Sequence, residues 1–75
     1  MKVDPLKLSR LRAMLASGEA RRVRTAAGLS YREAGDGCGV SLTTIYRWEN
    51  GMRAPRGEVA LRYLAILEAL AKVAA

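Results

Sequence analysis

Leucines recur at helical spacing near the start of the chain. Leu8, Leu11 and Leu15 fall on one side of a helix. Asp4 followed by proline is a common helix start, because the carboxylate accepts hydrogen bonds from free amides and proline suits the first turn. The pattern predicts a helix over residues 5–16, which a Ser-Gly pair interrupts.

A second, shorter helix is predicted over residues 19–27. Ala20, Val23 and Ala27 share one face of it, and the arginines between them lie largely off that face. Gly28 ends the pattern, since glycine readily adopts the left-handed conformation that follows many helices.

Three glycines mark the next segment. Ser30 and Glu33 have the spacing of a capping box, in which each side chain bonds to the other residue's backbone amide. Gly39 is expected to end this helix in a left-handed turn. Gly35 and Gly37 lie inside it, and each should cost about 1 kcal/mol relative to alanine. Two interpretations remain open: the helix is frayed here, or it needs glycine for close packing.

A fourth helix is predicted over residues 42–50. Ser41 is its N-cap, and Gly51 ends it. Ile45 and Trp48 are three residues apart, so they face the core together. The residues on the other side and at the N-terminal end are mostly polar or small.

The last predicted helix, residues 58–72, carries a wider apolar stripe than one core-facing side needs. One row is sufficient to close the core, and it consists of Val59, Ala60, Leu64 and Leu67. A second row consists of Tyr63, Ile66 and Leu70. Either the leucines of the first helix cover this second row, or it is a homodimer interface.

No segment alternates as a β-strand does, so the sequence predicts an all-α fold of five helices in a single domain, residues 1–75. Histidine is absent, and Cys38, an expected core filler, is the only cysteine. These counts exclude a metal site built on histidine or cysteine, a histidine-based triad and a disulfide framework. The carboxylates are scattered, so we expect no enzyme activity, cofactor or small-molecule ligand.

The chain carries 13 basic and 7 acidic side chains, which gives a formal charge of +6. This balance favours nucleic acid or an acidic surface as the partner. No apolar stretch is long enough to span a membrane, and the first residues lack the apolar core of a signal peptide, so a cytoplasmic location is expected. Residues 57–75 are neutral in sum and are therefore least suited to touch a polyanion.

Residues 28–51 combine a capped helix, a glycine turn and a second capped helix, which is the order of a helix-turn-helix motif. The segment resembles the helix-turn-helix of the Xre family, the phage-repressor-like DNA-binding domains. The matching positions are Gly28, Leu29, Ser30, Glu33, Gly39, Val40, Ser41, Ile45, Trp48, Glu49, Asn50, Gly51 and Pro55, with Arg21 and Arg24 upstream. Tyr31, Ala34 and Gly35 depart from the family's usual residues. The likeness covers residues 18–70 and implies a five-helix, lambda-repressor-like fold.

The resemblance also implies where DNA is read. The family's base-contacting positions correspond to Leu42, Thr43 and Arg47. Arg47 can donate two hydrogen bonds to guanine, and the methyl groups of leucine and threonine suit the thymine methyl. The hydroxyl of Thr43 or Thr44 can bond a base edge, so both belong to the expected base-contacting set.

Phosphate contacts are expected at the helix N-termini, where backbone amides favour anions, and in the loop after the second helix of the motif. The candidates are Ser30, Tyr31, Ser41, Arg53 and Arg56. The family also pairs an arginine of its first helix with the glutamate of Glu-Asn-Gly, which implies an ion pair between Arg24 and Glu49. Other arginines are expected to be solvated, namely Arg10, Arg12, Arg21 and Arg22, and Tyr46 is expected to pack.

These features predict a sequence-specific regulator of transcription, a repressor that occupies a double-stranded DNA operator with residues 42–50 in the major groove. The chain is either a short Cro-like regulator or the DNA-binding part of a longer repressor, and the family suggests a phage or bacterial source. One alternative is an excisionase-like architectural factor, which needs a β wing where this chain has a helical pattern. The other is an antitoxin or adaptor that uses the last helix, which requires the second apolar row to be exposed.

Overall fold

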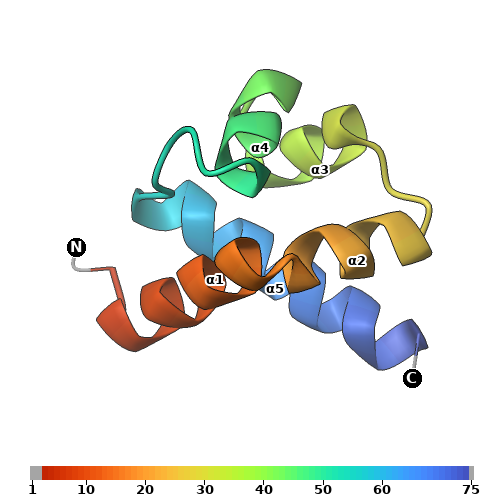
Figure 1. The fold of residues 1–75 in the computed structure, drawn as a ribbon, viewed down its shortest axis with the longest axis horizontal. Helices are drawn as coiled ribbons and strands as arrows, with labels where there is room; N and C mark the ends of the chain where they lie inside the picture. Colours follow the sequence, from red (N-terminus) through yellow and green to blue (C-terminus); the bar gives the residue numbers. More distant parts are fainter. Residues whose placement is uncertain (1–2, 75) are drawn as a thin grey trace.

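The computed structural model describes residues 3–74, and these residues form five helices and no strand (Figure 1). The helices are α1 (Pro5–Ser17), α2 (Glu19–Ala26), α3 (Tyr31–Cys38), α4 (Leu42–Glu49) and α5 (Gly57–Ala74). The predicted all-α fold with five helices is therefore confirmed, and the boundaries differ from the predicted ones only near the helix ends.

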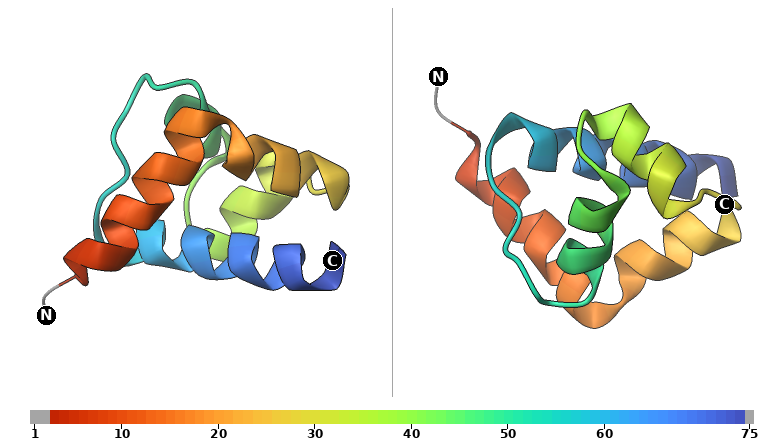
Figure 2. Two further views of the ribbon diagram at one scale, coloured as in Figure 1. Left: turned by 60° about the horizontal axis from the view of Figure 1, so that its bottom comes forward. Right: turned by 90° about the horizontal axis from the view of Figure 1, so that it is seen from above.

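α5 forms one wall of the molecule, and α1, α2 and α3 pack against it. α1 and α2 follow each other as a bent pair, with α3 and α4 above them in Figure 1. The bend lies at Gly18, which has a φ of 85° and donates its amide to the carbonyl of Leu15. Seen from above, α4 lies in the middle of the upper face, and the segment that joins it to α5 curves around its end (Figure 2).

Side chains from all five helices meet in one core. Its buried members are Leu11, Met14, Leu15, Ala20, Ala34, Cys38, Ile45, Trp48, Ala60, Tyr63, Leu64 and Leu67. The inward orientation predicted for Ile45 and Trp48 is confirmed. Cys38 is fully buried, and this burial raises the pKa of its thiol to about 11. The face predicted for the second helix is wrong at Ala27, which lies beyond α2 and is exposed.

Gly35 of α3 serves close packing, and the helix is not frayed. The helix is continuous from Tyr31 to Cys38. A Cβ atom on Gly35 would lie 2.6 Å from the carbonyl oxygen of Val40, which belongs to the turn leading into α4. Gly35 therefore lets the backbone of the turn approach α3 more closely than any side chain would allow. A Cβ on Gly37 would meet only the tip of Ile66, at 2.9 Å.

The second apolar row of α5 is not a free surface. Tyr63 is 0% exposed, its ring lies 6.0 Å from that of Trp48, and its hydroxyl bonds to Glu49. Ile66 is partly buried and packs against the core. Leu70, at the end of the row, is also partly buried but does not belong to the residues packed against the core. The alternative that Tyr63, Ile66 and Leu70 form a homodimer interface is therefore wrong at Tyr63, because Trp48 and Glu49 of α4 already cover that side chain.

Membrane-spanning helices and metal-binding clusters are both absent from the described residues. No helix among residues 3–74 combines the length and the apolar character needed to cross a bilayer. Within the same residues, no group of three or more cysteine, aspartate or glutamate side chains is arranged to hold a metal ion.

Candidate nucleic-acid interface

α4 has one buried and one exposed face. Ile45 and Trp48 point into the core with exposures of 0% and 4%. Leu42, Thr43, Tyr46 and Arg47 are all exposed on the other side. Because these four lie within one helix of eight residues, they form a continuous outward face near its N-terminal and middle turns. Thr44 differs from them: it is only half-buried, and its hydroxyl lies 3.1 Å from that of Ser41.

The end of α4 is held by a buried ionic network around Glu49. The guanidinium of Arg24, on α2, donates from Nε to Oε2 at 2.6 Å and from Nη2 to Oε1 at 2.9 Å. The hydroxyl of Tyr63, on α5, donates to Oε2 at 2.6 Å, and Nε of Arg21 lies 3.5 Å from Oε1. Three helices thus converge on one carboxylate whose side chain is 1% exposed.

The partners of Glu49 offset the desolvation of its charge. Burial by itself would raise the pKa of this carboxyl, but the hydrogen bonds from Arg24, Tyr63 and Arg21, together with the charge of Arg24, outweigh burial and hold the pKa below its usual value. The hydrogen bond to Glu49 likewise raises the pKa of Arg24 against the effect of burial. The pair therefore stays ionised, and α4 cannot rotate without leaving a buried charge unpaired.

Arg24 also connects this network to the start of α3. Its Nη1 donates to the carbonyl oxygen of Leu29 at 2.8 Å, and its guanidinium carbon lies 4.1 Å from the centre of the Tyr31 ring. Tyr31 in turn meets Tyr46 edge-on, with ring centres 5.6 Å apart. Tyr31 is therefore partly engaged in packing, whereas Tyr46 lies on the outward face of α4 and is 45% exposed.

Serine side chains cap both helices of the central pair. Ser30 Oγ accepts the amide of Glu33 at 3.0 Å, and the Glu33 carboxylate accepts the amide of Ser30, which completes the predicted capping box. Ser41 Oγ accepts the amide of Thr44 at 3.2 Å. Both serines are exposed, so an anion in solvent can approach the first turns of α3 and α4.

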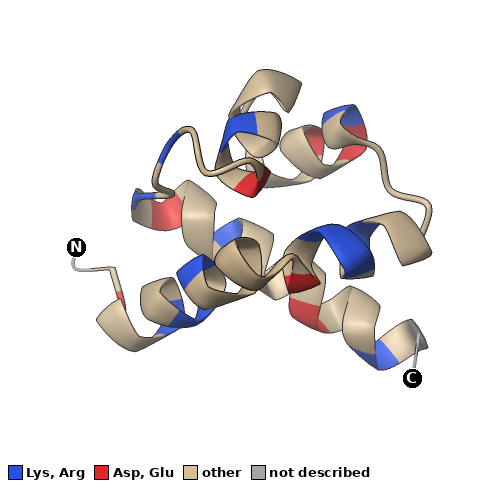
Figure 3. Cartoon of the chain, viewed as in Figure 1, with Lys and Arg blue, Asp and Glu red and all other residues tan. Residues whose placement is uncertain are grey.

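The segment after α4 brings two further arginines to the same side of the molecule. Asn50 donates to the carbonyl oxygen of Tyr46 and accepts from Arg21, and these contacts direct the chain out of the helix. Arg53 and Arg56 follow and are both exposed. Figure 3 shows the resulting group of basic positions on α4 and on the segment that leads to α5.

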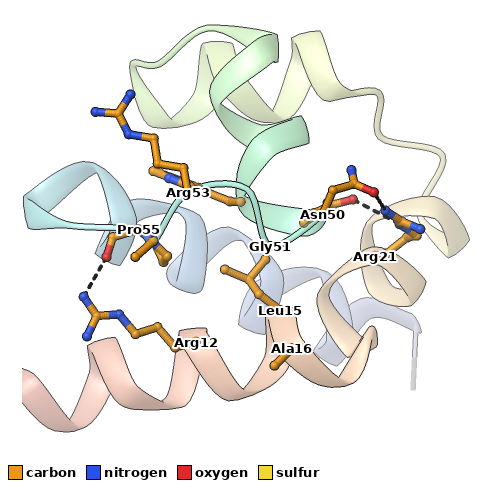
Figure 4. Close-up of a pocket in the computed structure, with 11 residues that line it drawn as sticks. Arg12, Leu15, Ala16, Arg21, Asn50, Gly51, Arg53 and Pro55 are labelled. Carbon is orange, nitrogen blue, oxygen red and sulfur yellow. Dashed lines mark hydrogen bonds and ion pairs between the residues drawn. The ribbon is translucent and has the colours of Figure 1, made fainter.

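A cleft of about 480 Å³ separates this segment from α1 (Figure 4). Leu15, Ala16 and Trp48 contribute to its walls. At one end of the cleft, Nη2 of Arg12 donates to the carbonyl oxygen of Pro55 at 3.0 Å. The first helix is thus linked directly to the segment that follows α4.

The capped pair α3–α4, the tight turn between them and the buried Arg24–Glu49 link agree with the comparison against known families. The family model described as Helix-turn-helix, of the Xre/Cro/C1 type, matches residues 21–72. The chain belongs to this helix-turn-helix family. Comparisons with curated proteins and with solved structures gave no match.

Membership confirms the predicted family and its lambda-repressor-like fold. As a helix-turn-helix domain of this type, the chain is a DNA-binding module rather than an enzyme. Within the matched residues, α3 and α4 are the two consecutive helices joined by the tight turn, as in a helix-turn-helix. α1 lies outside the matched residues, although it supplies Leu11, Met14 and Leu15 to the core.

Sequence reasoning missed three participants of this helix-turn-helix domain. Arg21 was expected to be solvated, yet it contacts Glu49 and Asn50; its position three residues before Arg24, on the same side of α2, was an available signal. The hydroxyl of Tyr63 inside an apolar stripe was a second signal, because a buried tyrosine normally finds a polar partner. The contact of Arg12 joins residues 43 positions apart and has no local signal.

Proposed function

We propose that this protein is a sequence-specific transcriptional repressor that inserts α4 into the major groove of double-stranded DNA. The observation that carries the proposal is the outward face of α4, where Leu42, Thr43 and Arg47 are exposed on a helix anchored from behind at Glu49. A helix held in this way presents its side chains in one orientation, which base reading requires.

Each exposed side chain suits a particular contact. Arg47 carries two parallel donors that match O6 and N7 of guanine, a pairing that discriminates by about 1–3 kcal/mol. Leu42 and the methyl group of Thr43 suit the thymine methyl, and the Thr43 hydroxyl suits a base edge. The hydroxyl of Thr44 is turned toward Ser41, so we assign base reading to Leu42, Thr43 and Arg47.

Phosphate contacts position the helix in the groove. The capped starts of α3 and α4, at Ser30 and Ser41, offer backbone amides to one stretch of the backbone. Arg53 and Arg56 are available to a phosphate beyond the other end of α4. Tyr31 can add its hydroxyl beside the first turn of α3. Occupancy of the operator would then block the polymerase, a mode of repression that needs no catalytic step.

The two alternatives have less support. An excisionase-like architectural factor would need a β wing after Pro55, where this chain continues into α5. An antitoxin or adaptor that docks through the second row of α5 would need Tyr63 at the surface, and this residue is fully buried.

The test is selection of binding sites from a random duplex library with the wild type, Arg47→Ala and the control Arg10→Ala. Arg10 is exposed on α1 and contacts Glu68 on α5, so this variant removes the same charge away from α4. We expect the wild type and the control to enrich the same guanine-containing sequence. Arg47→Ala should lose discrimination at one position by about 1–3 kcal/mol.

Other outcomes are equally informative. If all three proteins bind every sequence alike with a steep dependence on salt, the protein is a non-specific DNA binder and the repressor proposal is wrong. A palindrome in the enriched sequence would show that two copies bind together. Repression itself is measured by placing the enriched sequence over a reporter promoter.

A further inference from the structure

We propose that Arg12 positions the phosphate-binding segment of the domain, residues 51–56, through its hydrogen bond to Pro55. The inference rests on the proposed function, because it concerns how Arg53 and Arg56 are held where a phosphate backbone can meet them. It assigns a role to α1, which the family match at residues 21–72 leaves out.

The segment has few other constraints. Its start is held by two backbone hydrogen bonds, from Gly51 to Trp48 at 3.4 Å and from Met52 to Arg47 at 2.9 Å. Among the described residues, Arg12 is the one residue outside the segment that forms a hydrogen bond with residues 53–56. Proline has no N–H, so its carbonyl is the only backbone hydrogen-bonding group that this residue offers.

The cleft beneath the segment explains why this hydrogen bond matters. The cleft has a volume of about 480 Å³ and separates the segment from Leu15 and Ala16 of α1 (Figure 4). Packing therefore does not hold the segment against α1 along the cleft. The side chain of Arg12 crosses the end of this gap to reach Pro55, which is itself buried. The segment is therefore fixed at Pro55 by burial and by one directional hydrogen bond.

Arg12 is mounted on a rigid support. Its neighbours Leu11 and Leu15 are buried in the core, at 0% and 7% exposure, so α1 cannot shift without disrupting that core. Arg53 and Arg56 flank Pro55 in the sequence, and a displacement of the proline carbonyl would move both. Without Arg12, DNA would have to order the segment on binding, and the loss of chain freedom would lower the affinity.

Arg10 provides a matched control for charge. It lies on the same helix, is exposed and has the same side chain, but its Nε contacts Glu68 on α5 at 3.0 Å rather than the segment. Binding of the enriched duplex is measured for the wild type, Arg12→Ala and Arg10→Ala over a range of salt concentrations. We expect Arg12→Ala to weaken binding about tenfold and Arg10→Ala less than about threefold. Equal effects would overturn the proposal, since only the shared charge would then matter.

A double-mutant cycle tests the route of the effect. If Arg12 acts by placing Arg53, then Arg53→Ala should weaken binding less in the Arg12→Ala background than in the wild type. In Arg12→Ala, the slope of log K against log salt concentration should also become shallower by more than about 0.9, which is the change expected when one arginine–phosphate contact is lost. Additive losses would mean that Arg12 touches DNA independently, and the positioning role would be wrong.

A measurement without DNA separates this inference from the proposed function. Backbone order parameters of Ala54 and Arg56 are obtained by NMR relaxation on the three free proteins. Arg12→Ala should lower them, while Arg10→Ala leaves them as in the wild type. Unchanged values in Arg12→Ala would overturn the positioning role even if site selection succeeds. If site selection fails, this measurement still decides whether Arg12 orders the segment.

Discussion

Arg24 on α2 and Glu49 on α4 face each other through two hydrogen bonds of 2.6 and 2.9 Å, with side chains only 6% and 1% exposed. The geometry is bidentate, so it restrains direction as well as distance. Glu49 is the last residue of α4, and the pair therefore fixes the end of that helix against α2.

Arg24→Ala should destabilise the protein by about 3 kcal/mol or more, because it leaves a buried carboxylate without its main partner. Urea unfolding measures the free energy of unfolding. The control is Arg22→Ala, on the same helix but exposed, which should change that free energy by less than about 0.5 kcal/mol. Similar losses in both variants would contradict a structural role for the Arg24–Glu49 pair.

The stability should also depend on pH through Glu49. Its pKa in the folded protein is held below the usual value, so its contribution is complete above the unfolded pKa of about 4.3 and is lost as the pH falls through the folded pKa. Unfolding free energies are compared between pH 3 and 6 for the wild type and Glu49→Gln. The variant should be less stable near pH 6 and lose less on acidification. Parallel pH profiles would show that another group carries the effect.

Glu33 also contributes to the loss of stability at low pH, in the wild type and in Glu49→Gln alike. The hydrogen bond from the Ser30 amide lowers the pKa of Glu33, as the partners of Glu49 lower its pKa. The comparison with Glu49→Gln removes this shared contribution, so only the difference between the two profiles reports on Glu49.

The two glycines inside α3 should respond differently to alanine. Gly35→Ala places a Cβ 2.6 Å from the carbonyl oxygen of Val40, and this backbone atom cannot shift without disturbing the turn. We therefore expect the free energy of unfolding to fall by about 2 kcal/mol, despite the better helix propensity of alanine. Gly37→Ala meets only the flexible tip of Ile66, so the gain of about 1 kcal/mol in propensity should offset the contact. Thermal unfolding of both variants checks this, and a stabilised Gly35→Ala would contradict the close approach at Val40.

Cys38 should react slowly with thiol reagents in the folded protein. Its burial raises the pKa to about 11, which reduces the thiolate fraction about 100-fold relative to an ordinary cysteine. The rate of alkylation by iodoacetamide is measured at pH 8 in buffer and in urea. Equal rates in the two conditions would show that α3 opens readily around the thiol.

The local parts of this fold could be predicted from the sequence because their signals are local. Ser30 with Glu33, Ser41 and Asp4 all cap the helices that their spacing indicated, since a cap depends only on its own first turn. The exposed face of α4 followed in the same way from helical periodicity. The pairing of Arg24 with Glu49 came from the family resemblance, because the two lie 25 positions apart in the sequence.

The remaining features depend on how distant segments approach each other. The second row of α5 had the composition of an interface, and only the position of α4 shows that Tyr63 is already covered. The two interpretations of Gly35 could be separated only by the distance to Val40. The contact from Arg12 to Pro55 likewise depends on how α1 packs against α4 and α5, which no residue pattern specifies.

The position of Trp48 has a practical consequence. It is the only tryptophan of the chain, it packs beside Tyr63 on the buried face of α4, and it lines the cleft under residues 51–56. Its fluorescence therefore originates between the body of the domain and the segment that Arg12 holds. The chain thus contains an optical probe, placed where unfolding and a shift of that segment both change the surroundings of the indole, without any attached dye.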